Sequence, residues 1–122
     1  MSTILYVDDE AAIQRAIRSL LSRKGHTVLT AGSIAEARGV LAANAVDGAL
    51  IDLWLGPESG FDLLEWIDMH QPHLLTRVAV VTGEVIFEPE TQRMLDLYQR
   101  PVLSKPFDMT ELERLIAGWS AT

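Results

Sequence analysis

The chain has 122 residues, a net charge of −7 and no cysteine, and 48% of its residues are hydrophobic. This is the size of one compact domain, which we expect to span residues 1–122. The composition excludes a disulfide framework, and no apolar run approaches the ~20 residues of a membrane span. The signal-peptide pattern and the basic footprint of nucleic-acid binders are also missing. We therefore expect a cytoplasmic protein that neither inserts into a membrane nor binds nucleic acid directly.

Five short segments, rich in β-branched residues, are predicted to be strands. They are mostly apolar without alternation, which is typical of parallel strands buried on both faces of a sheet. In chain order they cover residues 4–7, 26–30, 48–53, 78–82 and 102–104.

Helical patterns follow each of these strands. In each pattern apolar residues recur three or four positions apart, and a residue typical of a helix end marks one boundary. In chain order the boundary residues are Gly25 after the first helix, Ser33 with Glu36 at the start of the second, Gly60 before the third, Pro89 at the start of the fourth, and Asp108 with Glu111 at the start of the fifth.

Strands that alternate with helices predict an α/β fold with a doubly wound parallel sheet of five strands and five helices. Connections between parallel strands are expected to be right-handed. Among the possible strand orders we expect the flavodoxin-like order 2-1-3-4-5, although the sequence alone leaves other orders open.

Polar residues stand at the carboxyl ends of four of these strands. Ligands of open α/β sheets bind beyond those ends, where the strand order reverses, here between the first and third strands. The polar residues are Asp8 and Asp9 after the first strand, Asp52 in the third, Thr82 in the fourth and Lys105 after the fifth. Each alone is commonly a helix cap, a turn residue or a solvated side chain, but the ordered set indicates one site.

The residue types at this site suit phosphoryl transfer assisted by a cation. At an effective dielectric near 20, two unit charges ~4 Å apart repel by roughly 4 kcal/mol, so clustered carboxylates need positive charge. Carboxylate and carbonyl oxygens with water suit Mg²⁺. A carboxylate can act as the nucleophile, while a lysine and a hydroxyl group stabilise the phosphoryl oxygens.

The motifs LYVDDE, ALIDL, VAVVTG and LSKPF resemble those of response-regulator receiver domains, and the resemblance extends from about residue 4 to residue 119. It implies that Asp52 accepts a phosphoryl group from a phosphohistidine on a histidine kinase or histidine phosphotransfer protein. It also implies that Thr82 and Lys105 contact the phosphoryl oxygens, and that the bond between Lys105 and Pro106 is cis. Such a domain is a switch that catalyses only its own phosphorylation and dephosphorylation.

For the metal, the resemblance implies that Asp9, Asp52 and the backbone carbonyl of Trp54 bind Mg²⁺ directly. Asp8 would act mainly through a water molecule. The cofactor expected on this basis is Mg²⁺ alone.

The sequence departs from the family pattern at several positions. Val102 stands where the family usually has an aromatic residue on the fifth strand, which puts the rotation of that ring during switching in doubt. Pro57 lies one place later than is common. Trp54 and Glu84 occupy variable positions beside the phosphorylation site, and a bulky Trp54 predicts slow self-dephosphorylation. The segment RPVLSKPF resembles receivers attached to hybrid sensor histidine kinases.

Two other functions stay open at this level. One is a Mg²⁺-dependent phosphatase that uses an aspartyl phosphate, although the haloacid-dehalogenase-like enzymes of this kind need a D-x-D motif, and residues 52–54 read DLW. The other is an interaction module that works without phosphorylation. Only the departure at Val102 favours this module, and the intact set of polar residues at the strand ends argues against it. The downstream target is not predicted.

Overall fold

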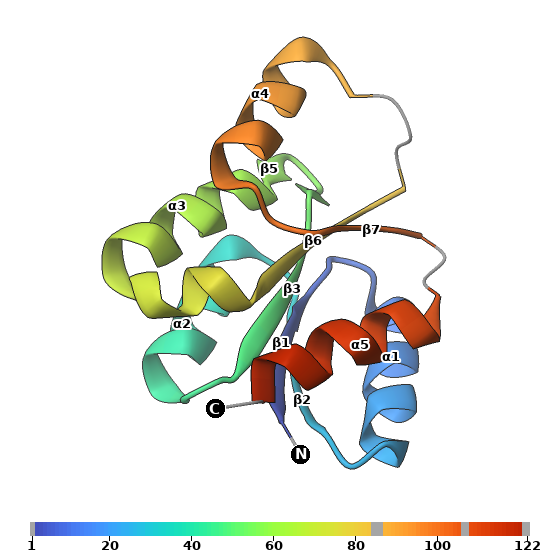
Figure 1. The fold of residues 1–122 in the computed structure, drawn as a ribbon. Helices are drawn as coiled ribbons and strands as arrows, with labels where there is room; N and C mark the ends of the chain where they lie inside the picture. The colour runs from blue at the N-terminus through green and yellow to red at the C-terminus, as the bar shows by residue number, and fades with distance from the viewer. Residues whose placement is uncertain (1, 84–86, 106–107, 121–122) are drawn as a thin grey trace.

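The computed structural model describes residues 2–83, 87–105 and 108–120. Its main sheet has five parallel strands in the order β2-β1-β3-β6-β7 (Figure 1). The strands are β1 (Thr3–Val7), β2 (Thr27–Ala31), β3 (Gly48–Asp52), β6 (Val78–Thr82) and β7 (Val102–Ser104). In chain order these are the five predicted strands, so the flavodoxin-like order 2-1-3-4-5 is confirmed.

Helices cover both faces of this sheet (Figure 1). One face carries α1 (Ala11–Arg23) and α5 (Met109–Ser120), and the other carries α2 (Ile34–Ala43), α3 (Gly60–His70) and α4 (Pro89–Tyr98). A 3-10 helix, η1 (Pro72–Arg77), precedes β6 and was not predicted. Within the described residues, no helix is both long and apolar enough to cross a membrane.

The strands are buried on both faces, as their lack of alternation predicts. In β1, Leu5 and Val7 pack into the cluster under α2 and α3, whereas Ile4 and Tyr6 pack into the cluster under α1 and α5. All four side chains are fully buried. Burying a large apolar side chain stabilises a fold by roughly 1.5–3 kcal/mol, so the two clusters hold the strand ends in place from both sides.

A short hairpin after Asp52 was not predicted. Its strands, β4 (Trp54–Leu55) and β5 (Glu58–Ser59), pair antiparallel across Gly56 and Pro57. Gly56 has a φ of +62°, and proline fixes the next φ near −65°, which is the combination of a type II′ turn. The displaced proline therefore belongs to a defined two-residue turn.

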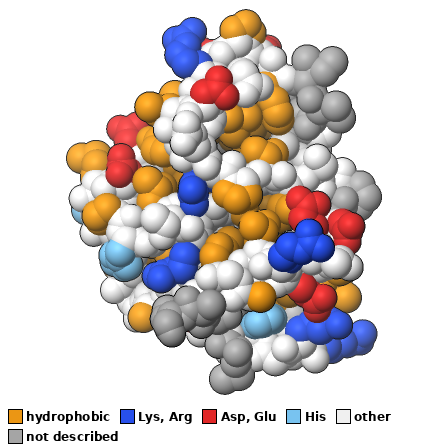
Figure 2. Space-filling model, in the orientation of Figure 1, with side chains coloured by type: hydrophobic (Ala, Val, Ile, Leu, Met, Phe, Trp, Pro, Cys, Tyr) orange, Lys and Arg blue, Asp and Glu red, His pale blue; other side chains and the backbone are white. Residues whose placement is uncertain are grey.

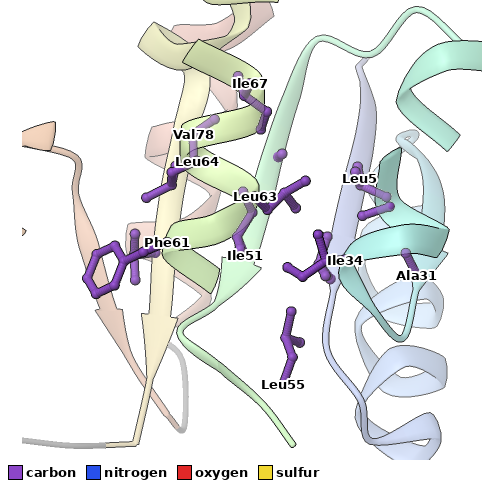
Figure 3. Close-up of a cluster of buried hydrophobic side chains, with 14 of the residues drawn as sticks. Leu5, Ala31, Ile34, Ile51, Leu55, Phe61, Leu63, Leu64, Ile67 and Val78 are labelled. Carbon is purple, nitrogen blue, oxygen red and sulfur yellow. The ribbon is translucent and has the colours of Figure 1, made fainter. Parts of the chain in front are cut away.

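This hairpin is attached to the body of the protein at two points. The side chain of Leu55 lies in the buried cluster near Ile34 and Ile51 (Figure 3). The carboxylate of Glu58 accepts a hydrogen bond of 3.2 Å from the backbone N–H of Ile34, in the first turn of α2. The chain that follows Asp52 is thus held against α2.

Close packing at the start of α3 also constrains the backbone of Asp52. A Cβ atom on Gly60 would lie 2.3 Å from the carbonyl oxygen of Asp52 and 3.1 Å from the side chain of Ile51. Both distances are below ordinary van der Waals contact, and the nearer obstacle is backbone. Glycine at this position lets α3 begin directly beside the end of β3.

We expect Gly60→Ala to lower the thermal midpoint, because the added methyl group forces α3 away from Asp52 at a cost of roughly 1–3 kcal/mol. Gly39→Ala is the matched control. Gly39 is exposed within α2 and has nothing within 4 Å of its Cβ position, so alanine there should stabilise the helix by about 1 kcal/mol. Thermal unfolding followed by circular dichroism measures both changes, and equal effects of the two variants would contradict the packing argument.

Candidate functional site

Because the five strands are parallel, their carboxyl ends lie along one edge of the sheet. Asp8 follows β1, Asp52 and Thr82 are the last residues of β3 and β6, and Lys105 follows β7. The Nζ atom of Lys105 lies 2.7 Å from Oδ2 of Asp52 and 3.0 Å from Oδ2 of Asp8. Three residues from distant parts of the sequence therefore meet in one buried ion-pair cluster.

The carboxylate of Asp52 is nearly enclosed, since its side chain is 8% exposed. Its Oδ2 atom accepts from Lys105, and its Oδ1 atom accepts a hydrogen bond of 3.0 Å from the backbone N–H of Trp54. Burial raises the pKa of Asp52 above its ordinary value, against the opposing effect of both hydrogen bonds. The negative charge of Asp8 is the smallest of the effects on this pKa. Desolvation, and not the repulsion between carboxylates that the sequence suggests, is therefore the main cause of the raised pKa.

Asp8 is fully buried, and its carboxylate accepts three hydrogen bonds from described residues. Its Oδ2 atom accepts from Lys105 and, at 2.8 Å, from the hydroxyl group of Tyr6, while its Oδ1 atom accepts from the backbone N–H of Glu10 at 3.0 Å. The contact from Tyr6 was not predicted. A sequence signal for it exists, because residues two apart on a strand point to the same face of the sheet.

Lys105 is the cation of the cluster and is 22% exposed at its side chain. Burial lowers its pKa, but the hydrogen bonds to Asp52 and Asp8 outweigh that effect, and the net pKa is raised. The backbone N–H of Lys105 donates a hydrogen bond of 2.9 Å to the carbonyl of Thr82. Thr82 is itself buried, and the space around Gly83 is open where a side chain would stand.

An acidic group lies at the end of β1. Among the described residues, Asp8, Asp9 and Glu10 each offer a carboxylate oxygen, and these oxygens all lie within 4.8 Å of one another. Glu10 was not among the predicted ligands, while Asp52 of the predicted set lies outside this group and contacts Lys105. A donor set made only of oxygen atoms fits Mg²⁺, so the residues present are compatible with the predicted metal.

Trp54 places its side chain away from the core, with 44% of the residue exposed. It lines a cleft of about 330 Å³ between the start of α3 and α4, together with residues that include Phe61, Asp62 and Met94. Figure 2 shows hydrophobic side chains gathered around α4 on the face in view. The effect of Trp54 on dephosphorylation stays a prediction.

Two further expectations concern residues outside the described part of the chain. These are the cis bond before Pro106 and the position of Glu84 beside the phosphorylation site. Val102 is described, and it is 37% exposed on β7, which lies at the edge of the sheet.

Comparison with known proteins is consistent with this geometry. The family model of the response regulator receiver domain matches residues 4–117. The chain is 32% identical over 112 residues to the transcriptional regulatory protein GltR of Pseudomonas aeruginosa. This alignment covers 90% of the chain and 45% of GltR. The chain is also 40% identical over 80 residues to the alginate biosynthesis transcriptional regulatory protein AlgB of Pseudomonas putida. This alignment covers 66% of the chain and 17% of AlgB. The chain thus spans less than half the length of these two curated relatives.

Solved structures show the same fold. A response regulator receiver protein from Pseudomonas putida superposes with a TM-score of 0.83 at 28% identity, covering 95% of each chain. Chemotaxis protein CheY4 of Vibrio cholerae gives a TM-score of 0.83 at 24% identity, covering 97% of this chain and 98% of CheY4. The association with hybrid sensor kinases stays a prediction. The family match over almost the whole chain, together with this fold, shows that the chain belongs to the response regulator receiver domain family.

Proposed function

We propose that Asp52 accepts a phosphoryl group from a phosphohistidine on a histidine kinase or histidine phosphotransfer protein, and that phosphorylation switches the partner interactions of the chain. The observation that carries this proposal is the contact of one lysine with two buried carboxylates, Asp8 after β1 and Asp52 at the end of β3. An ammonium group 2.7 Å from Asp52 Oδ2 is already in place beside the oxygen that would be phosphorylated. Membership of the receiver family supports the same assignment.

In the proposed reaction a carboxylate oxygen of Asp52 attacks phosphorus. The bond between phosphorus and the imidazole nitrogen of the donor breaks, a P–O bond to Asp52 forms, and histidine leaves. The ionised carboxylate is the nucleophile, so the contacts from Lys105 and from the Trp54 N–H hold the reactive form in place despite its burial. Lys105 and the hydroxyl group of Thr82 then stabilise the phosphoryl oxygens.

The metal proposed for this site is Mg²⁺, held by Asp9, Asp52 and the backbone carbonyl of Trp54, with Asp8 acting through water. When bound, it supplies positive charge that neutralises the phosphoryl oxygens. Glu10 belongs to the same acidic group and is a further candidate for contact through water.

The proposed switch starts from a change of partner for Lys105. Before phosphorylation its ammonium group contacts Asp52 and Asp8, and after phosphorylation it contacts the phosphoryl group. The backbone of Lys105 is hydrogen-bonded to Thr82, so a shift there reaches the ends of β6 and β7 together. Because Val102 has no ring to rotate, we assign the switch in this chain to these two strand ends.

Incubation with acetyl phosphate and Mg²⁺ should give one phosphoryl adduct per chain that hydroxylamine removes, because an aspartyl phosphate is an acyl phosphate. Intact-mass spectrometry measures the adduct. Asp52→Asn should abolish it, while Asp68→Asn, which removes an exposed carboxylate on α3, should leave it unchanged.

An adduct that persists in Asp52→Asn would contradict the assignment of the phosphoacceptor. A complete lack of adduct in the wild type would favour the interaction module that works without phosphorylation. Continuous release of phosphate from small phosphate esters, in turn, would favour the phosphatase.

The charge balance of the cluster predicts opposite stability changes at two of its residues. Because the folded-state pKa of Asp52 is raised, this carboxyl group favours folding when protonated, and that contribution is lost as the pH rises through the folded-state pKa. At neutral pH without metal, Asp52→Asn should therefore raise the thermal midpoint, by about 4 °C if the gain is roughly 1 kcal/mol. Lys105→Met leaves two buried carboxylates without their cation and should destabilise by roughly 3 kcal/mol.

Thermal unfolding at neutral pH in the presence of a chelator measures both variants. An unchanged or lower midpoint for Asp52→Asn would show that the buried charge is already compensated. The double variant should recover part of the loss caused by Lys105→Met, because only one carboxylate then lacks the lysine.

A further inference from the structure

Tyr6 is a polar residue that the proposed phosphoryl transfer does not use. It lies in the middle of the buried cluster under α1 and α5, among side chains such as Ile4, Leu50 and Leu103. A buried hydroxyl group costs free energy unless it is hydrogen-bonded, so an aliphatic residue or phenylalanine would satisfy packing alone. The hydroxyl group instead donates a 2.8 Å hydrogen bond to Oδ2 of Asp8.

We propose that Tyr6 is a positioning residue whose hydroxyl group fixes the Asp8 carboxylate in the orientation needed to hold a divalent cation through a water molecule. The inference rests on the proposed function, because it assigns Tyr6 to the metal site of that function. It goes beyond that function by naming a side chain that acts through Asp8 and touches neither the cation nor the phosphoryl group.

The orientation of Asp8 needs such support. The terminal torsion of an aspartate is broad, so hydrogen bonds decide where the two oxygens point. An ionised carboxylate accepts about four hydrogen bonds, and Tyr6, Lys105 and the Glu10 N–H supply three. The carboxylate of Asp8 can thus accept about one more hydrogen bond. It belongs to an acidic group whose other members are Asp9 and Glu10.

Tyr6 and Lys105 differ in how permanent their contacts are. Lys105 also contacts Asp52, and in the proposed reaction its ammonium group moves to the phosphoryl oxygens. Tyr6 is fully buried on β1, and Asp8 is two residues later, directly after the strand ends. The hydroxyl group therefore keeps Asp8 oriented in both states, whereas the lysine does so only before phosphorylation.

A tyrosine hydroxyl group carries its proton at neutral pH and can therefore donate a hydrogen bond. Burial, followed by the hydrogen bond to Asp8, raises the pKa of Tyr6 far above its ordinary value. A neutral phenol can donate to a carboxylate without adding charge to the site. Groups that orient metal-binding side chains in this way typically change metal affinity about 10- to 100-fold.

Tyr6→Phe tests the proposal, because it removes the hydroxyl group and keeps the ring. We expect the Mg²⁺ dissociation constant of the unphosphorylated chain to rise by about tenfold, the lower end of the range for such partners. Isothermal titration calorimetry with MgCl₂ measures it, and tryptophan fluorescence gives a second reading. Tyr98→Phe, at the chain's other tyrosine, is the matched control and should leave the constant unchanged.

Asp8→Asn separates positioning from packing. In that background Tyr6→Phe should cause no further loss of Mg²⁺ affinity, because the carboxylate that the hydroxyl group orients is gone. The yield of acetyl phosphate labelling in Tyr6→Phe should also recover at saturating Mg²⁺, which a defect in folding would not do.

Two results would overturn the assignment of Tyr6 while leaving the proposed function standing. One is an unchanged dissociation constant with only a lower thermal midpoint, which would mean a packing role. The other is tighter Mg²⁺ binding by Tyr6→Phe, which would mean that the hydroxyl group competes with the cation. A wild-type chain that binds no Mg²⁺ would overturn both proposals.

Discussion

One ammonium group shared by two buried carboxylates is the interaction on which the site depends. Lys105 brings Asp8 and Asp52 together although they stand at the ends of different strands, and its ammonium group contacts both carboxylates. One positive charge still does not balance two negative charges, and burial continues to raise the pKa of Asp52. The site therefore has a net negative charge in a desolvated environment. A bound cation is attracted most strongly under these conditions.

The fold positions these groups through backbone geometry. Parallel strands bring their carboxyl ends to one edge, and helix-covered faces bury those ends so that the charges are desolvated. Gly60 lets α3 start directly beside Asp52, while the hairpin fixes the following residues through Glu58. The same close packing that stabilises the sheet thus limits how far the Asp52 carboxylate can move, which is the precision that phosphoryl transfer needs.

Much of this arrangement follows from sequence patterns, and the rest depends on partners distant in the chain. Uninterrupted apolar runs predict the strands, and the rule for ligands at strand ends predicts which polar residues converge. The second strand ends one residue later than predicted, at Ala31, because its pairing with Val7 of β1 sets the boundary. The hairpin was missed since its strands have two residues each, too few for a periodic signal. The hydroxyl group of Tyr6 was missed because its ring fits a buried strand.

In the proposed switch, the Asp8 carboxylate has contacts of two kinds. If the only donor to its carboxylate were Lys105, transfer of that lysine to a phosphoryl group would leave a fully buried charge without its partner. The backbone N–H of Glu10 and the hydroxyl group of Tyr6 come from the same strand end as Asp8 and do not depend on Lys105. In the proposed switch Lys105 therefore exchanges partners while Asp8 keeps two hydrogen bonds, which compensate part of the cost of burying its carboxylate.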